Sequence, residues 1–100
     1  MVREIIWTNN AEADLNFCFS EFLEHCESLD VTKRIFIEIY NSVSILATNA
    51  EIYKLDLLKK NNKGNIRFFE KHSYRISYLI DTKFVYILRI RPSRKEPLEF

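Results

Sequence analysis

Residues 66–91 have the sequence IRFFEKHSYRISYLIDTKFVYILRIR, in which apolar and polar side chains largely alternate. The alternation covers residues 66–71, 74–80 and 84–91, and short polar segments such as Asp81-Thr82-Lys83 separate these runs. A period of two is typical of β-strands, because successive side chains point to opposite faces of a sheet. This segment therefore predicts three antiparallel strands joined by tight turns.

The preceding chain predicts a strand followed by a helix. Residues 2–7 are short, apolar and β-prone, so a strand is expected there. Asn9 with Glu12 three residues later resembles a capping box, which marks the start of a helix. Apolar residues then recur at helical spacing, and the first helix should cover residues 11–28.

A second helix follows, with Asp30 or Thr32 as its cap and an end near Asn49. For residues 51–64 the pattern leaves open whether a third short helix or a strand forms. The order is β-α-α-β-β-β, which predicts an α+β fold with a helical hairpin packed on a small antiparallel sheet. A single domain over residues 1–100 is expected from the length.

The composition predicts a compact cytoplasmic protein. Hydrophobic residues make up 47% of the chain, enough for a packed core. No apolar run reaches the roughly 20 residues of a membrane span, and no signal peptide is recognised. Cys18 and Cys26 lie eight residues apart on the first expected helix, about 12 Å, which is too far for a disulfide.

Charge is divided unevenly between the two halves of the chain. Residues 1–50 hold three basic and eight acidic side chains, a formal charge of −5. Residues 51–100 hold twelve basic and six acidic side chains, a formal charge of +6. Arginines on a rigid sheet hold phosphates or carboxylates in defined geometry, so a polyanion or an acidic peptide is the expected partner.

Alternation assigns side chains to the two faces of the predicted sheet. The face expected to lie under the helices carries Tyr74, Ile76, Tyr78, Phe84, Tyr86, Leu88 and Ile90. The three tyrosines are therefore interpreted as core residues rather than as residues that stack on nucleic-acid bases. Arg75, Arg89 and Arg91 are expected on the opposite face and, with Arg94, form the predicted binding surface. The alternative is an ordinary solvated strand face.

Other site chemistry has little support. Cys18, His25 and Cys26 lack the spacing of metal ligands, and neither a metal nor another cofactor is predicted. His72 lies between two expected strands, near Arg75. It is either an exposed turn residue or a general acid or base.

The order of several short segments resembles the RelE/ParE superfamily of toxins from bacterial type II toxin–antitoxin modules. The matching segments are Ile5-Ile6-Trp7-Thr8, Ala13-Asp14-Leu15, Arg67-Phe68, Tyr74-Arg75-Ile76-Ser77-Tyr78, Ile87-Leu88-Arg89-Ile90-Arg91 and Arg94-Lys95-Glu96-Pro97. The resemblance spans nearly the whole chain. It implies the same fold, and a growth-inhibiting toxin of a plasmid-stabilisation module.

The superfamily contains two mechanisms. RelE-like members are ribosome-dependent endoribonucleases that cleave messenger RNA without a metal, whereas ParE-like members bind and poison DNA gyrase. Both are neutralised by a small antitoxin, and a homodimer or a toxin–antitoxin heterotetramer is the implied assembly. An antitoxin segment with acidic and apolar residues is expected to lie over the sheet.

Only some of the catalytic residues of RelE-like ribonucleases have a counterpart in this sequence. Arg67 and Arg75 match basic strand residues of RelE, Arg94 or Lys95 matches the basic residue after the last strand, and His72 is the added acid–base candidate. These five residues are the catalytic candidates if the chain is a ribonuclease.

Two positions depart from the RelE pattern. Phe69 stands where RelE has a lysine, and Phe100 stands where RelE-like enzymes carry a tyrosine. Phenylalanine can stack on a base but cannot exchange a proton. The preferred interpretation is a ParE-like toxin, with RelE-like ribonuclease activity as the alternative and a degenerate, non-toxic binding module as the second alternative.

Overall fold

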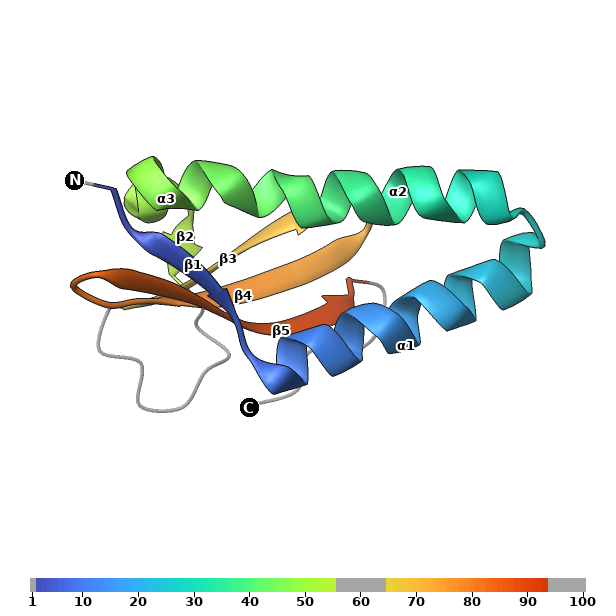
Figure 1. Ribbon diagram of the computed structural model, residues 1–100, viewed down its shortest axis with the longest axis horizontal. Coiled ribbons are helices and arrows are strands. Elements are labelled where there is room, and N and C mark those ends of the chain that lie inside the picture. The colour runs from blue at the N-terminus through green and yellow to red at the C-terminus, as the bar shows by residue number, and fades with distance from the viewer. Residues whose placement is uncertain (1, 56–64, 94–100) are drawn as a thin grey trace.

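The computed structural model describes residues 2–55 and 65–93. In chain order its elements are β1 (Glu4–Trp7), α1 (Asn9–Cys26), α2 (Leu29–Ser42), a 3-10 turn (Val43–Ile45), α3 (Leu46–Asn49), a second 3-10 turn (Ala50–Ile52), β2 (Lys54–Leu55), β3 (Ile66–Lys71), β4 (Tyr74–Ile80) and β5 (Phe84–Pro92). The α+β fold class and the order of the main elements are confirmed (Figure 1). None of the described helices has the length and hydrophobicity required to cross a membrane.

The strands form one mixed sheet in the order β1-β5-β4-β3-β2. β1 runs parallel to β5, with Glu4 opposite Phe84 and Trp7 opposite Ile87. The expected antiparallel pairing is therefore wrong for this strand, because a helical crossover returns the chain in the parallel direction. In the segment left open above, β2 pairs with β3, and residues 56–64 lie outside the described part.

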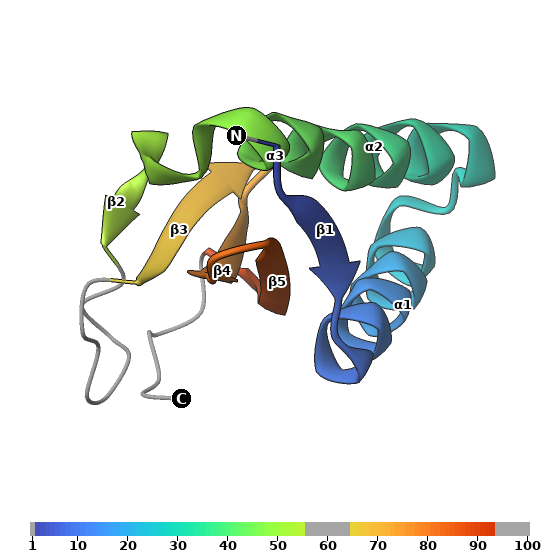
Figure 2. The ribbon, with the colours of Figure 1, turned by 60° about the vertical axis from the view of Figure 1, so that its left-hand side comes forward.

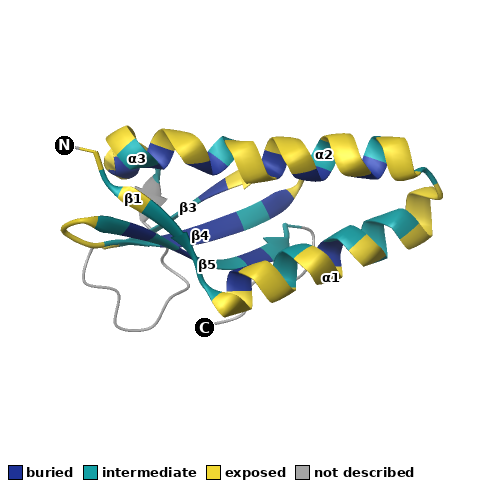
Figure 3. Cartoon of the chain, viewed as in Figure 1, coloured by how far each residue is buried: buried dark blue, intermediate teal, exposed yellow. Residues whose placement is uncertain are grey.

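The helices occupy two positions around the sheet. α2 runs over one face of the sheet, and its buried residues point towards the strands (Figure 3). α1 lies along β5 at the side of the sheet (Figure 2). The hairpin is therefore splayed, with only one of its two helices directly above the strands.

Both helices begin at other residues than expected. Thr8 caps α1, since its hydroxyl accepts a hydrogen bond from the Ala11 amide at 3.2 Å. Ser28 caps α2 by accepting from the Val31 amide at 3.3 Å. The predicted caps at Asn9 and at Asp30 or Thr32 are therefore wrong, because the hydroxyl groups that cap the helices belong to residues that precede these candidates. The expected end near Asn49 is correct, although the last turns form separate short helices.

A β-bulge in β5 changes the phase of its side chains. Ser77 pairs with Arg89, but the next residue of β4, Tyr78, pairs with Ile87. Leu88 is therefore an extra residue on β5. A bulge of this kind reverses the alternation on one strand, so residues before and after it cannot be assigned by a single period.

The bulge overturns part of the predicted core face. The buried side chains of β5 are Val85, Ile87 and Ile90. Phe84, Tyr86 and Leu88 were expected among them, and all three remain partly exposed. The assignments of Tyr74, Ile76 and Tyr78 on β4 are confirmed by their burial.

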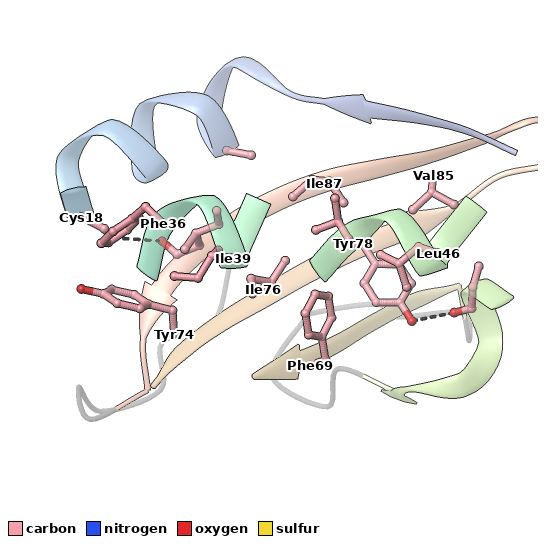
Figure 4. Close-up of a cluster of buried hydrophobic side chains, with 14 residues drawn as sticks. Cys18, Phe36, Ile39, Leu46, Phe69, Tyr74, Ile76, Tyr78, Val85 and Ile87 are labelled. Carbon is pink, nitrogen blue, oxygen red and sulfur yellow. Dashed lines mark hydrogen bonds between the residues drawn. The ribbon is translucent and has the colours of Figure 1, made fainter. Parts of the chain in front are cut away.

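The core lies between the sheet and the helical segments (Figure 4). Tyr78 is fully buried, and its hydroxyl donates to the Ala50 carbonyl at 2.6 Å. Burial raises the pKa of Tyr78, so this hydroxyl stays a neutral donor. Phe36 of α2 packs against Tyr74 with ring centroids 5.3 Å apart. These contacts fix α2 and the following turn over β4.

Side chains of α1 and its cap complete the edge of β5 beyond the point where β1 ends. The Thr8 hydroxyl donates to the Ile87 carbonyl at 2.7 Å. One turn into α1, Asp14 Oδ2 accepts from the Ile90 amide at 3.0 Å. Asp14 also receives Arg89 Nε at 2.7 Å and Arg89 Nη2 at 3.1 Å, a two-point ion pair. A helix thus supplies polar partners that a neighbouring strand would otherwise provide.

Replacing Asp14 by Ala should lower the free energy of unfolding by about 2–3 kcal/mol, because it removes the acceptor of a backbone amide and of a half-buried guanidinium. Urea denaturation measures the change. The control is Glu24→Ala, which removes an exposed carboxylate from the same helix and should change stability by less than about 0.5 kcal/mol. Equal effects of the two substitutions would contradict this role of Asp14.

Candidate binding surface

The side of the sheet turned away from α2 presents basic and aromatic side chains next to each other. We call this surface the open face, and define it by Phe68, Glu70, Arg75, Ser77 and Arg91, of which Ser77 is buried beneath its neighbours. Their strand neighbours Phe69, Ile76 and Ile90 are buried in the core on the other side. The open face is thus the part of the sheet where arginines and apolar groups meet.

Arg75 occupies the centre of the open face. Its guanidinium carbon lies 3.4 Å from the centroid of the Phe68 ring, a cation–π contact that orients the group. Glu70 lies across from Arg75 on β3, and Arg91 lies across from it on β5. Across the sheet, Glu70 attracts Arg75 and Arg91 repels it, so one carboxylate and two guanidinium groups meet on this face. The predicted placement of Arg75 and Arg91 away from α2 agrees with this register.

Arg89 does not point onto the open face as expected. Although its backbone pairs with Ser77 of that face, its guanidinium reaches the β5 edge and binds Asp14. The hydrogen bond to Asp14 raises the pKa of Arg89 above its ordinary value. The sequence assignment missed this because the two partners lie 75 residues apart. Arg89 therefore belongs to the helix–sheet contact.

Arg67 lies on the helix side of the sheet, opposite Tyr78 in the register. Its Nη1 donates to the Tyr53 carbonyl at 2.8 Å and to the Glu51 carbonyl at 3.4 Å. These bonds connect β3 to the chain that leads into β2. The side chain thus has a structural role at the sheet's far edge.

His72 and Ser73 form the two-residue turn between β3 and β4, with φ values of 51° and 66°. His72 Nε2 donates to the Glu38 carboxylate of α2 at 2.7 Å. This hydrogen bond lowers the pKa of Glu38. The turn interpretation of His72 is confirmed, and the contact fastens the β3–β4 hairpin to α2.

The ribonuclease candidates within the described residues do not converge. Arg67 and His72 point to the helix side at different places, whereas Arg75 points to the open face. Arg94, Lys95 and Phe100 lie outside the described residues. No three His, Cys, Asp or Glu side chains of residues 2–55 and 65–93 gather as metal ligands.

Phe69, the first departure from the RelE pattern, is a core residue. It is 6% exposed, and its ring stacks on Tyr53 with centroids 4.7 Å apart. A lysine at this position would bury a charge against two aromatic rings, which is strongly unfavourable. The substitution thus fits the packing of this chain.

Comparisons with known proteins agree with this architecture. A structure described as a chromosomal ParDE toxin–antitoxin system from P. aeruginosa superposes with a TM-score of 0.70 at 18% identity, over 91% of this chain and 96% of that one. The RelBE2 toxin–antitoxin complex from Mycobacterium tuberculosis gives 0.53 at 17% identity, over 92% and 99%. At such low sequence identity, structural similarity is evidence of a shared fold and of nothing further. A search with the sequence among curated proteins returns no match.

The fold, taken with the family model that matches most of the chain, is that of the RelE/ParE superfamily of toxins. The family model of the ParE toxin of the type II toxin–antitoxin system parDE matches residues 5–97. The chain therefore belongs to the ParE toxin family.

The Glu38–His72 contact should make stability depend on pH in acid. Because the pKa of Glu38 is lowered in the folded state, its contribution is present above the ordinary value of 4.5 and is lost as pH falls below it. Wild type should therefore be more stable than Glu38→Gln at about pH 6, and the difference should be smaller at about pH 3. Urea denaturation across this range measures it.

The matched control for this measurement is Glu24→Gln, which changes an exposed glutamate of α1. Its difference from wild type should stay nearly constant between the two pH values. A Glu38→Gln variant that follows the wild-type pH profile would contradict the contribution of this contact.

Proposed function

We propose that this toxin arrests growth by binding DNA gyrase, and that a cognate antitoxin neutralises it. Membership of the parDE toxin family supports the gyrase target, since the ParE-like members that the sequence resembles poison gyrase. The antitoxin is supported by the two similar structures, both described as toxin–antitoxin assemblies. The mechanism is one of binding, with no bond made or broken.

The dispersal of the basic side chains is the observation that carries this proposal. Cleavage of RNA requires a general base and charge-stabilising groups around one phosphate. Of the three ribonuclease candidates that the structure describes, Arg67 binds backbone carbonyls, His72 binds Glu38, and Arg75 alone lies on the open face. This distribution favours a binding surface over a ribonuclease site.

The open face is the proposed site of the antitoxin. Arg75 and Arg91 offer positive charge, and Phe68 beside them offers an apolar ring. An antitoxin segment with alternating acidic and apolar residues would match both features. Arg89 is left out of this proposed interface, because its guanidinium already binds Asp14.

The gyrase target is tested by inducing the toxin and scoring two readouts in the same cells. Plasmid supercoiling should be lost while messenger RNA stays intact, and the purified protein should inhibit gyrase in vitro. RNA cleavage with normal supercoiling would favour the RelE-like alternative. In that case Arg75→Ala should abolish cleavage, and the control Arg34→Ala, an exposed arginine of α2, should not.

A toxin that leaves growth, supercoiling and RNA unchanged would contradict the proposal and support the non-toxic binding module. To exclude misfolding as the cause, the same preparation is checked by its cooperative unfolding in urea. Binding to the antitoxin serves as the second check of a native surface.

The antitoxin site is tested with the double substitution Arg75→Ala/Arg91→Ala. The affinity for the cognate antitoxin should fall about hundredfold, since each lost contact to a charged group is worth about 1.5 kcal/mol or more. Titration calorimetry or surface binding measures the dissociation constant. Arg34→Ala is the control and should bind as wild type does. An unchanged affinity of the double variant would refute this placement.

A further inference from the structure

One acidic side chain interrupts the basic surface of the open face. Glu70 of β3 lies directly across from Arg75 of β4, which in turn lies across from Arg91 of β5. The three side chains therefore form one row across three neighbouring strands, which we call the charge row. Directly opposite side chains in a sheet have Cβ atoms about 5 Å apart, so the charge row is about 10 Å long.

All three members of the charge row lie on the same side of the sheet. The residues next to them are buried on the helix side: Phe69, Ile76 and Ile90. Glu70 itself is exposed, whereas Arg75 and Arg91 are partly buried. An exposed carboxylate therefore stands at the β3 end of a row whose other two members are cations.

The order of charges along the row limits which anions fit on it. Two positive charges and one negative charge leave a net charge of +1 on the row. An anionic group bound between Arg75 and Arg91 lies within about 5–10 Å of the Glu70 carboxylate. In water, the repulsion between two unit charges about 7 Å apart is worth about a threefold change in affinity, and it is larger near a protein surface.

Nucleic acids and peptides differ in how they can match this order. A nucleic-acid strand carries a phosphate at every nucleotide, so its backbone offers neither a neutral nor a positive group to Glu70. A peptide has an independent side chain at each position. Acidic residues can therefore face the two arginines while an apolar or basic residue faces Glu70.

We propose that Glu70 determines the specificity of the open face by keeping the phosphate backbone of nucleic acids away from Arg75 and Arg91. The inference rests on the proposed function in one respect, since it treats the open face as a surface for protein rather than for nucleic acid. Glu70 acts by its charge within the surface itself. Its removal should therefore create a binding activity, which the loss of a merely structural contact would not do.

The probe is a fluorescein-labelled single strand of about twelve deoxythymidines, which carries uniform charge and forms no base pairs. Fluorescence anisotropy at low salt measures its dissociation constant with the wild-type chain and with Glu70→Gln. The substitution removes one negative charge and keeps the size of the side chain. We expect the variant to bind the oligonucleotide at least about fivefold more tightly than wild type, and high salt should reduce the gain.

The matched control is Glu24→Gln, which makes the same change of charge at an exposed glutamate of α1. It should bind the oligonucleotide within about twofold of wild type, because Glu24 is not a member of the charge row. In a chain that also carries Arg75→Ala and Arg91→Ala, Glu70→Gln should give no gain. Cooperative urea unfolding shows that each variant is folded.

Three results would overturn the proposal. They are wild-type binding as tight as that of Glu70→Gln, equal gains for Glu70→Gln and Glu24→Gln, and a gain that persists without the two arginines. None of them depends on gyrase. If Glu70→Gln shows the expected gain while the induced toxin leaves supercoiling unchanged, the gyrase proposal fails and the role of Glu70 stands.

Discussion

The contact on which the arrangement of the helices and sheet depends is the one between Asp14 and the edge of β5. β1 pairs with β5 only as far as Ile87, so the strand's next amides need other acceptors. Asp14 accepts from the Ile90 amide and from the Arg89 guanidinium at once. This requirement holds α1 along the side of the sheet, while α2 alone covers the face above β4. The position of α1 thus follows from a backbone demand of the last strand.

The same contact also connects the acidic and the basic part of the chain. It uses one acidic residue of the helical half and one arginine of the basic half, and so joins the two halves electrostatically. Arg75 and Arg91 lie on the open face, with Arg75 over the ring of Phe68. The exposed carboxylates Glu24, Glu27 and Asp30 belong to the helical hairpin. Two surfaces of opposite charge in one small domain favour partners of different chemistry.

The local patterns predicted which segments form helices and strands, because amphipathic periods depend on neighbours within a few residues. They failed where the information is non-local. The bulge at Leu88 reverses the faces of β5, and nothing in the alternation marks it. Thr8, and not Asn9, caps α1. Its hydroxyl also donates a hydrogen bond to β5, a contact that only the folded chain provides. For the site, Arg75 was assigned by alternation alone, but the partner of Arg89 required the tertiary fold.

The exposure of Ile37 and Tyr40 also follows from the position of α1. Because Thr8 and Asp14 hold α1 against β5, the helix cannot move over α2 to cover Ile37 and Tyr40 without losing these polar contacts. A half-buried carboxylate or guanidinium without its partner is more costly than an exposed isoleucine or tyrosine. The isolated chain therefore keeps the edge contacts and leaves Ile37 and Tyr40 exposed.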